Sequence, residues 1–162
     1  MALSIPIISE FDGKGLDRAI KEFKAKATDI AQPAIDAGKA AYEPLENEQH
    51  PYALSGMSRR WTSDGRKIFP FRLDKAIKGV QMKFDTRRKA VGVIMILQKD
   101  VATAVWETAG RRNTNKLGAS LGFVASDQTR ILKPAIEKDI AKVEREIEKI
   151  VKDAIRTVQR GI

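Results

Sequence analysis

The chain has 162 residues, of which 43% are hydrophobic and 31% are charged, a composition typical of a soluble globular protein. The absence of cysteine excludes disulfides and thiolate metal sites, and the longest apolar run, residues 90–97, is too short to span a bilayer. The formal net charge of +9 makes polyanions plausible neighbours. The length suits a single domain, residues 1–162.

The first part of the chain is expected to be helical, over about residues 14–48. Apolar residues recur every three or four positions from Leu16 to Ile30, which predicts one amphipathic stripe. Pro33 lacks an amide N–H and collides with the preceding turn, so we expect a kink or restart there, with an alanine-rich helix continuing to Glu48 and Pro44 as a second candidate kink. The opening residues have no basic segment before their apolar run, so we do not expect a signal peptide.

A connector and a meander are expected over about residues 52–107. Residues 52–78 mix glycine and proline with aromatic residues, which predicts turns and short pieces that pin anchors onto the core. Apolar and polar residues then alternate over 80–84, which predicts a half-buried strand. The expected remainder is a turn at 85–89, a central strand at 90–97, a turn at Lys99 and Asp100, and a third strand at 101–106.

The end of the chain is predicted to be a long loop, about residues 108–126, and a long helix, about 134–160. The loop is rich in glycine and asparagine, and loops of this length tend to be functional or mobile. The apolar residues of the helix step by four and three, a spacing near that of a coiled coil but wider than a simple seam, so we favour packing on the sheet.

These elements predict an α+β fold: an antiparallel sheet of three to four strands packed by a kinked N-terminal helix and a long C-terminal helix.

The residues needed for catalysis are scarce. His50 is the only histidine and follows Gln49 in a predicted loop, where a surface or capping role is expected. A carboxylate metal site would have to combine residues such as Glu107 with Asp100 or Asp85, although strand ends and turns commonly carry single acids. The glycines lack the spacing of a phosphate-binding loop. We therefore expect no enzyme activity, no cofactor and no bound metal.

Positive charge is concentrated in residues 59–89, which hold eleven lysines and arginines but only three acids. Basic residues neutralise phosphates, and nearby aromatic residues such as Trp61 can stack on bases. A solvated basic face and core aromatics explain the same pattern. A surface that faces DNA without reading its sequence is the stronger of the two nucleic-acid hypotheses.

Several stretches resemble the tail-completion and head-to-tail joining proteins of long-tailed bacteriophages, a family that includes tail-terminator-like ring proteins. The stretches that carry the resemblance are S-G-M-S-R-R-W at 55–61, V-W-E-T-A-G-R at 105–111, R-I-L-K-P-A at 130–135 and the opening I-P-I-I-S-E-F-D-G at 5–13. The loop at 113–126 and the kinked first helix depart from the common pattern.

The resemblance implies a non-enzymatic virion protein of the neck or tail, assembled in the host cytoplasm as a ring, expected to be a hexamer, between the head connector and the tail tube. Its expected partners are itself, the neck or connector protein, the tail tube protein and DNA passing through the channel, with no membrane. The alternative is a basic, non-enzymatic DNA-binding protein.

Two sets of residues receive roles in such a ring. At the subunit interface, Trp106 would fill the core or a subunit boundary, Glu107 would meet an arginine of a neighbouring element or subunit, and Gly110 would turn the chain into the basic loop. The expected interface residues are Trp106, Glu107, Gly110, Arg111 and Arg112, and the expected basic residues facing a DNA channel are Arg59, Arg60, Arg66, Lys67, Arg87, Arg88 and Lys116.

Overall fold

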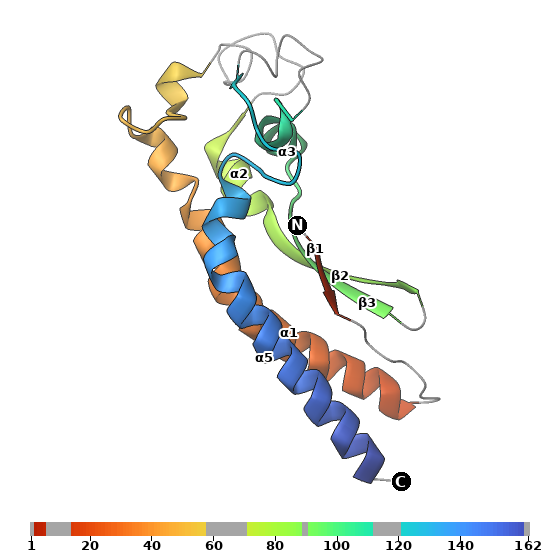
Figure 1. Cartoon of the computed structure of the whole chain (residues 1–162). Helices are drawn as coiled ribbons and strands as arrows, with labels where there is room; N and C mark the ends of the chain where they lie inside the picture. Colours follow the sequence, from red (N-terminus) through yellow and green to blue (C-terminus); the bar gives the residue numbers. More distant parts are fainter. Residues whose placement is uncertain (1, 6–13, 58–70, 89–90, 112–120, 161–162) are drawn as a thin grey trace. The chain divides into compact units, whose positions relative to one another are not determined.

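The computed structural model describes residues 2–5, 14–57, 71–88, 91–111 and 121–160 (Figure 1). The chain forms two compact units. Unit 1 contains Met1–Ile35, Met82–Leu97 and Asp139–Ile162, and unit 2 contains Asp36–Gln81 and Gln98–Lys138.

A three-stranded sheet lies mostly in unit 1. Its strands are β1 (Ala2–Ile5), β2 (Val80–Arg88) and β3 (Val91–Gln98), in the order β1-β3-β2. β1 runs antiparallel to β3, with Ala2 opposite Met95. The prediction of a central strand at 90–97 is therefore confirmed, because β3 has a neighbour on each side.

Two long helices contribute to both units. They are α1 (Lys14–Ala40) and α5 (Leu132–Arg160). In unit 1 the buried residues of α1 include Ala27 and Ala31, and those of α5 are Val143 and Ile147. The residues on α5 lie four apart and bury one face of the helix, as the sequence predicts for residues 134–160.

Short helices and turns make up unit 2. They are the 3-10 helices η1 (Glu43–Glu46) and η2 (Leu54–Gly56) and the α-helices α2 (Leu73–Gly79) and α3 (Val101–Thr108). Gly38, near the end of α1, lies in this core: a Cβ there would be 2.9 Å from Leu132 Cδ1 and 3.1 Å from Ile136 Cγ2. The start of α5 thus packs closely on the end of α1.

The predicted third strand at 101–106 is wrong, because these residues form α3. Asp100 caps the helix: its Oδ2 accepts hydrogen bonds from Thr103 N (3.0 Å) and Thr103 Oγ1 (2.7 Å). Ala102, Thr103, Trp106 and Glu107 are buried, and this spacing is that of a helical face rather than of alternating strand positions. The Asp100 cap and the burial of one helical face therefore stabilise a helix here, although the β-branched residues of this segment favour a strand.

Two predicted boundaries also differ. α1 continues through Pro33 but ends at Ala40 instead of reaching Glu48. Ala40 lies four residues before Pro44, where a proline ring collides with the carbonyl in an α-helix, and the chain changes to η1. The predicted turn at 85–89 is largely strand, because β2 extends to Arg88.

The mixed class of helix and sheet, α+β, is confirmed. The loop predicted for 108–126 lies partly outside the described residues. No helix in the described parts of the chain is long and apolar enough to cross a membrane.

Candidate functional site

A buried carboxylate links three elements of unit 2. Glu107, in the last turn of α3, is 2% exposed. Its Oε2 accepts a hydrogen bond from Ile131 N (2.9 Å), and its Oε1 accepts one from Leu132 N (3.0 Å). These are the amides at the start of α5, where a helix has no internal acceptors and carries a partial positive charge. Glu107 is therefore a long-range cap for α5.

A tyrosine completes the surroundings of this carboxylate. Tyr42, just beyond α1, is fully buried and donates its hydroxyl to Glu107 Oε1 at 2.6 Å. Burial, and next the negative charge of Glu107, raise the pKa of the Tyr42 hydroxyl well above its ordinary value. The hydroxyl consequently remains a donor, and Gln98 Nε2 lies 3.4 Å from its oxygen.

Arg130 binds the carbonyl groups at the C-terminal end of α3. It is 7% exposed, and its Nε donates to Trp106 O at 2.9 Å while a terminal nitrogen donates to Ala109 O. It also donates to Leu121 O (2.8 Å) and Gly122 O (3.0 Å). Its guanidinium lies 5.9 Å from the Trp106 ring centroid. Carbonyls at a helix C-terminus carry partial negative charge, so they compensate the buried cation.

The chain turns sharply after α3, at Gly110. Its φ is +94°, in the left-handed region that favours glycine. A Cβ at this position would be 2.2 Å from Gly122 O, so the two backbone segments touch only because residue 110 has no side chain. Val124 N donates to Gly110 O at 3.3 Å, which joins the segments further.

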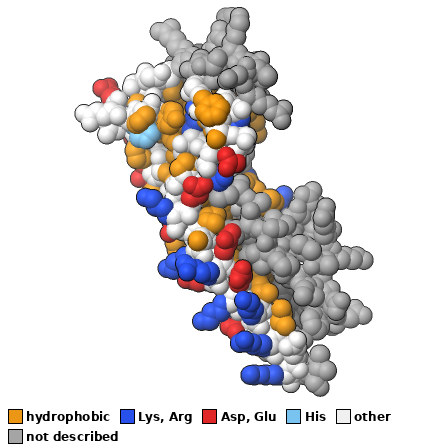
Figure 2. Space-filling view, viewed as in Figure 1, with side chains coloured by type: hydrophobic (Ala, Val, Ile, Leu, Met, Phe, Trp, Pro, Cys, Tyr) orange, Lys and Arg blue, Asp and Glu red, His pale blue; other side chains and the backbone are white. Residues whose placement is uncertain are grey.

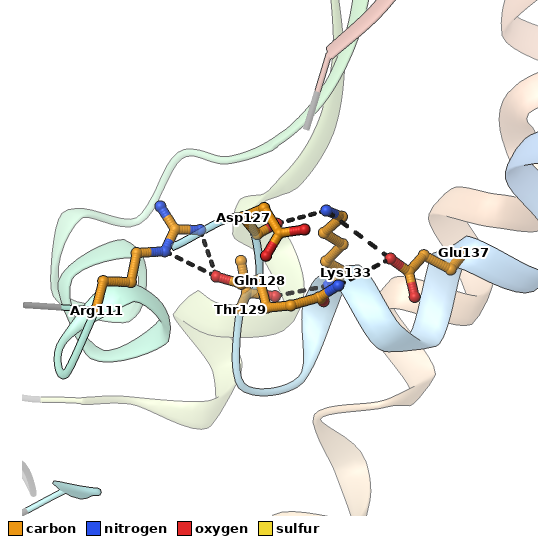
Figure 3. Close-up of polar contacts among 6 residues, drawn as sticks. All are labelled: Arg111, Asp127, Gln128, Thr129, Lys133 and Glu137. Carbon is orange, nitrogen blue, oxygen red and sulfur yellow. Dashed lines mark hydrogen bonds and ion pairs between the residues drawn. The ribbon is translucent and has the colours of Figure 1, made fainter. Parts of the chain in front are cut away.

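Polar contacts also order the segment just before α5 (Figure 3). Arg111 donates from Nε to Gln128 O at 2.8 Å, and Lys133 N donates to Thr129 Oγ1 at 2.7 Å. Lys133 Nζ donates to Asp127 O and lies 3.8 Å from a carboxylate oxygen of Glu137. The backbone amides of Ile131 and Leu132 thus donate to Glu107, and that of Lys133 donates to Thr129. The next residue, Pro134, has no amide N–H, so every amide donor at the start of α5 has an acceptor.

This arrangement holds together the end of α3 and the start of α5. Its charged groups point at helix ends inside the protein. His50 caps a turn, accepting at Nδ1 from Tyr52 N (3.1 Å). Within the described ranges, no group of three or more histidines or acids could hold a metal ion.

The structure brings four of the predicted interface residues together. Trp106 and Glu107 lie inside unit 2, Gly110 forms the turn, and Arg111 binds the chain before α5. Among the described residues, Glu107 bonds to Tyr42 and two backbone amides, and not to an arginine side chain.

The remaining predicted residues are not assigned contacts. Arg112, Arg59, Arg60, Arg66, Lys67 and Lys116 lie outside the described residues, and Arg87 and Arg88 are placed in β2 without described side chains.

Tyr42 and Arg130 are not among the residues predicted from the sequence for this site. Tyr42 and Glu107 are 65 residues apart, and no local pattern connects them. In the sequence, Arg130 is one residue of the stretch at 130–135 that precedes the last predicted helix. The sequence does contain one signal for such a site. An acid near the end of one predicted element and a base directly before a helix can each stabilise the other element's end.

Comparison of the chain with protein-family models, with curated proteins and with solved structures found no match.

Replacing Glu107 should strongly destabilise the protein. Glu107→Ala leaves two amides and the Tyr42 hydroxyl without their acceptor, so we expect the free energy of unfolding to fall by about 3–5 kcal/mol. Glu107→Gln keeps one acceptor oxygen and should recover part of that loss. Urea unfolding measures both, with Glu144→Gln on the exposed face of α5 as the control, expected within about 0.5 kcal/mol of wild type. A Glu107→Ala variant as stable as the control would contradict the capping role.

The Tyr42 hydroxyl should make stability depend on alkaline pH. Tyr42→Phe removes a hydrogen bond to a charged group and should cost about 1.5–3 kcal/mol at pH 7. Because the pKa of Tyr42 is raised on folding, the native state keeps this proton when the unfolded chain loses it. The stabilisation is complete below about pH 10 and shrinks above it, by up to about 1.4 kcal/mol per pH unit.

The measurement is urea unfolding of wild type and Tyr42→Phe between pH 8 and 11. The stability difference should narrow above about pH 10. Tyr52→Phe, which keeps the ring that packs edge-on against Trp106, is the matched control. A difference between wild type and Tyr42→Phe that stays constant over this range would refute the assignment.

Alanine substitutions at three glycines should distinguish the cost of a steric clash from the cost of a strained backbone conformation. Gly122→Ala should cost about 1–2 kcal/mol, because Gly122 has φ +88° but open space around a Cβ. Gly110→Ala should cost more, about 3 kcal/mol or above, because its Cβ also meets a backbone oxygen. Gly56→Ala, with neither feature, should be close to neutral. Equal losses at Gly110 and Gly122 in thermal or urea unfolding would disprove the close approach of the two segments.

Proposed function

We propose that the protein is a structural virion protein of a long-tailed bacteriophage. In this proposal it forms a ring, expected to be a hexamer, in the neck or at the top of the tail, where it joins the head connector to the tail tube. It is not an enzyme and has no cofactor. Its partners are other copies of itself, the adjoining neck and tail proteins, and DNA that it contacts through phosphates.

One observation carries the proposal: two of the stretches that resemble joining proteins form one cluster. Glu107 from the stretch at 105–111 caps the amides of Ile131 and Leu132 in the stretch at 130–135. Arg130 returns the contact by binding Trp106 O. The two stretches therefore serve one structural purpose, which supports reading them together.

Phe123 supports a self-association role for the surface beside this cluster. Its side chain is 75% exposed, although it lies between two fixed points of the backbone. Arg130 binds the carbonyl of Gly122 before it, and Val124 after it is buried. Aromatic residues held in place lose little entropy on binding and are frequent anchors of interfaces. We propose that Phe123 contacts the neighbouring subunit.

The scaffold of the ring in this proposal is an antiparallel sheet of three to four strands packed by a kinked N-terminal helix and the long C-terminal helix. Sheet edges that would otherwise invite aggregation can pair between subunits, and head-to-tail contacts of this kind close into a ring when the rotation allows. The basic residues at 59–67, 87–88 and 116 are proposed to face the channel. Assembly would take place in the host cytoplasm.

The direct test is light scattering on a size-exclusion column, followed by electron microscopy of any large species. A closed ring, or a monomer that assembles into particles with purified connector or tail tube protein, would support the joining role. A monomer or dimer that binds duplex DNA with steep salt dependence and never assembles would favour the alternative, a basic DNA-binding protein.

Phe123→Ala should weaken self-association without unfolding the protein. We expect at least about a tenfold higher dissociation constant for the oligomer, because an anchor residue is removed from the interface. Val101→Ala is the matched control, since Val101 is also an exposed apolar residue (60%) but lies at the start of α3. Sedimentation measures association and circular dichroism checks the fold. Unchanged association of Phe123→Ala would remove Phe123 from the interface.

A further inference from the structure

Charges on α5 are sorted into rows. At about 100° per residue, the apolar seam that includes Val143 and Ile147 occupies one side of the helix. Acidic residues border this seam on both sides, for example Glu144 on one and Glu146 on the other. Over residues 139–160, which belong to unit 1, the basic residues fall on the side opposite the seam, within a sector about 80° wide. We call them the basic stripe: Lys142, Arg145, Lys149, Lys152, Arg156 and Arg160.

Every residue of the basic stripe is exposed. Figure 2 shows lysine and arginine side chains gathered along the part of the molecule that contains α5. Two of the six have acidic neighbours on the same helix, Lys152 with Glu148 and Arg156 with Asp153, each at 3.9 Å. Exposed pairs of this length contribute little energy and leave the cations accessible to a stronger partner.

We propose that the basic stripe binds the phosphate backbone of duplex DNA. Its residues follow one another at intervals of about 4.5–6 Å along the helix and extend for about 27 Å, roughly three-quarters of one turn of the duplex. A duplex supplies one negative charge per about 1.7 Å of its axis. The stripe therefore meets a partner with charge along its whole length. This inference goes beyond the proposed ring and does not depend on it.

The acidic borders determine how DNA is bound. A helix inserted into the major groove would turn its two sides toward the phosphate walls, and on α5 these sides carry Glu144 and Glu146. Like charges would oppose that position. The stripe is instead suited to lie on the backbone, where it contacts phosphates without reading bases.

The other polyanionic partners fit less well. A second copy of α5 offers two acidic rows, Asp139, Glu146 and Asp153 on one side of the seam and Glu137, Glu144 and Glu148 on the other. Each row has three acids, about 6–10.5 Å apart, against the six more closely spaced basic residues of the stripe. Membrane-surface helices place basic residues beside an exposed apolar face, whereas here the apolar seam lies opposite the stripe and is buried at Val143 and Ile147.

The test is fluorescence anisotropy of the purified full chain with labelled duplexes of about 20 base pairs, between 50 and 200 mM NaCl. The stripe variant carries Lys142→Gln, Arg145→Gln, Lys149→Gln and Lys152→Gln. The control variant carries Lys21→Gln, Lys26→Gln, Lys75→Gln and Lys78→Gln, which are exposed positions outside α5. Both variants lose four positive charges, so they separate the stripe from net charge.

Wild type should bind two unrelated duplex sequences equally. The stripe variant should bind at least about tenfold more weakly at 100 mM salt, and the slope of log K against log salt should become shallower by about 3–4. The control variant should keep most of its affinity and slope. Circular dichroism verifies that both variants remain helical.

Three outcomes would overturn the proposal. They are equal losses in the two variants, no binding of DNA by wild type, and binding of a polyglutamate peptide that DNA does not displace. The last would assign the stripe to an acidic protein surface. Ring formation is measured separately by light scattering, so a failure of DNA binding and a failure of assembly are distinguishable.

Discussion

The capping of α5 by the buried Glu107 carboxylate is the contact on which unit 2 depends. A buried carboxylate is costly unless donors surround it, and here Tyr42, Ile131 and Leu132 supply them. Arg130 faces the equivalent problem with opposite sign and is surrounded by carbonyls at the end of α3. Glu107, on α3, thus stabilises the start of α5, and Arg130, just before α5, stabilises the end of α3. The two segments therefore hold each other in place.

Long periodic elements could be predicted from the sequence. The apolar spacing of α5 and the apolar run of β3 each specify one element whatever the rest of the chain does. Val101–Thr108 could not be assigned in the same way, because eight residues give less than three helical turns and its two valines and two threonines favour strands. The deciding information was Asp100, whose side chain bonds to Thr103. β1 has only four residues and gains its stability from pairing with β3.

The site shows a different limit of sequence reasoning. In the sequence, Trp106 and Glu107 are an aromatic residue and an acid at the end of an apolar run, and the resemblance implies an arginine as the partner of Glu107. Folding instead places its carboxylate on backbone amides and directs Arg130 to backbone carbonyls. Helix termini act as charges that a sequence does not display, so a search for pairs of opposite side chains overlooks them. Tyr42 is similarly unpredictable, because only the fold brings it to residue 107.

The outward direction of the basic stripe follows from the packing of α5. Burial of Val143 and Ile147 fixes the rotation of the helix about its axis, and the stripe lies on the opposite side of the same helix. A change that loosens the packing of Val143 and Ile147 would therefore let the helix rotate and point the whole stripe in another direction, even with every lysine and arginine intact. The amide bonds to Glu107 fix the start of the helix in the same way. The packing on one side of α5 consequently determines which way the basic stripe on the other side faces.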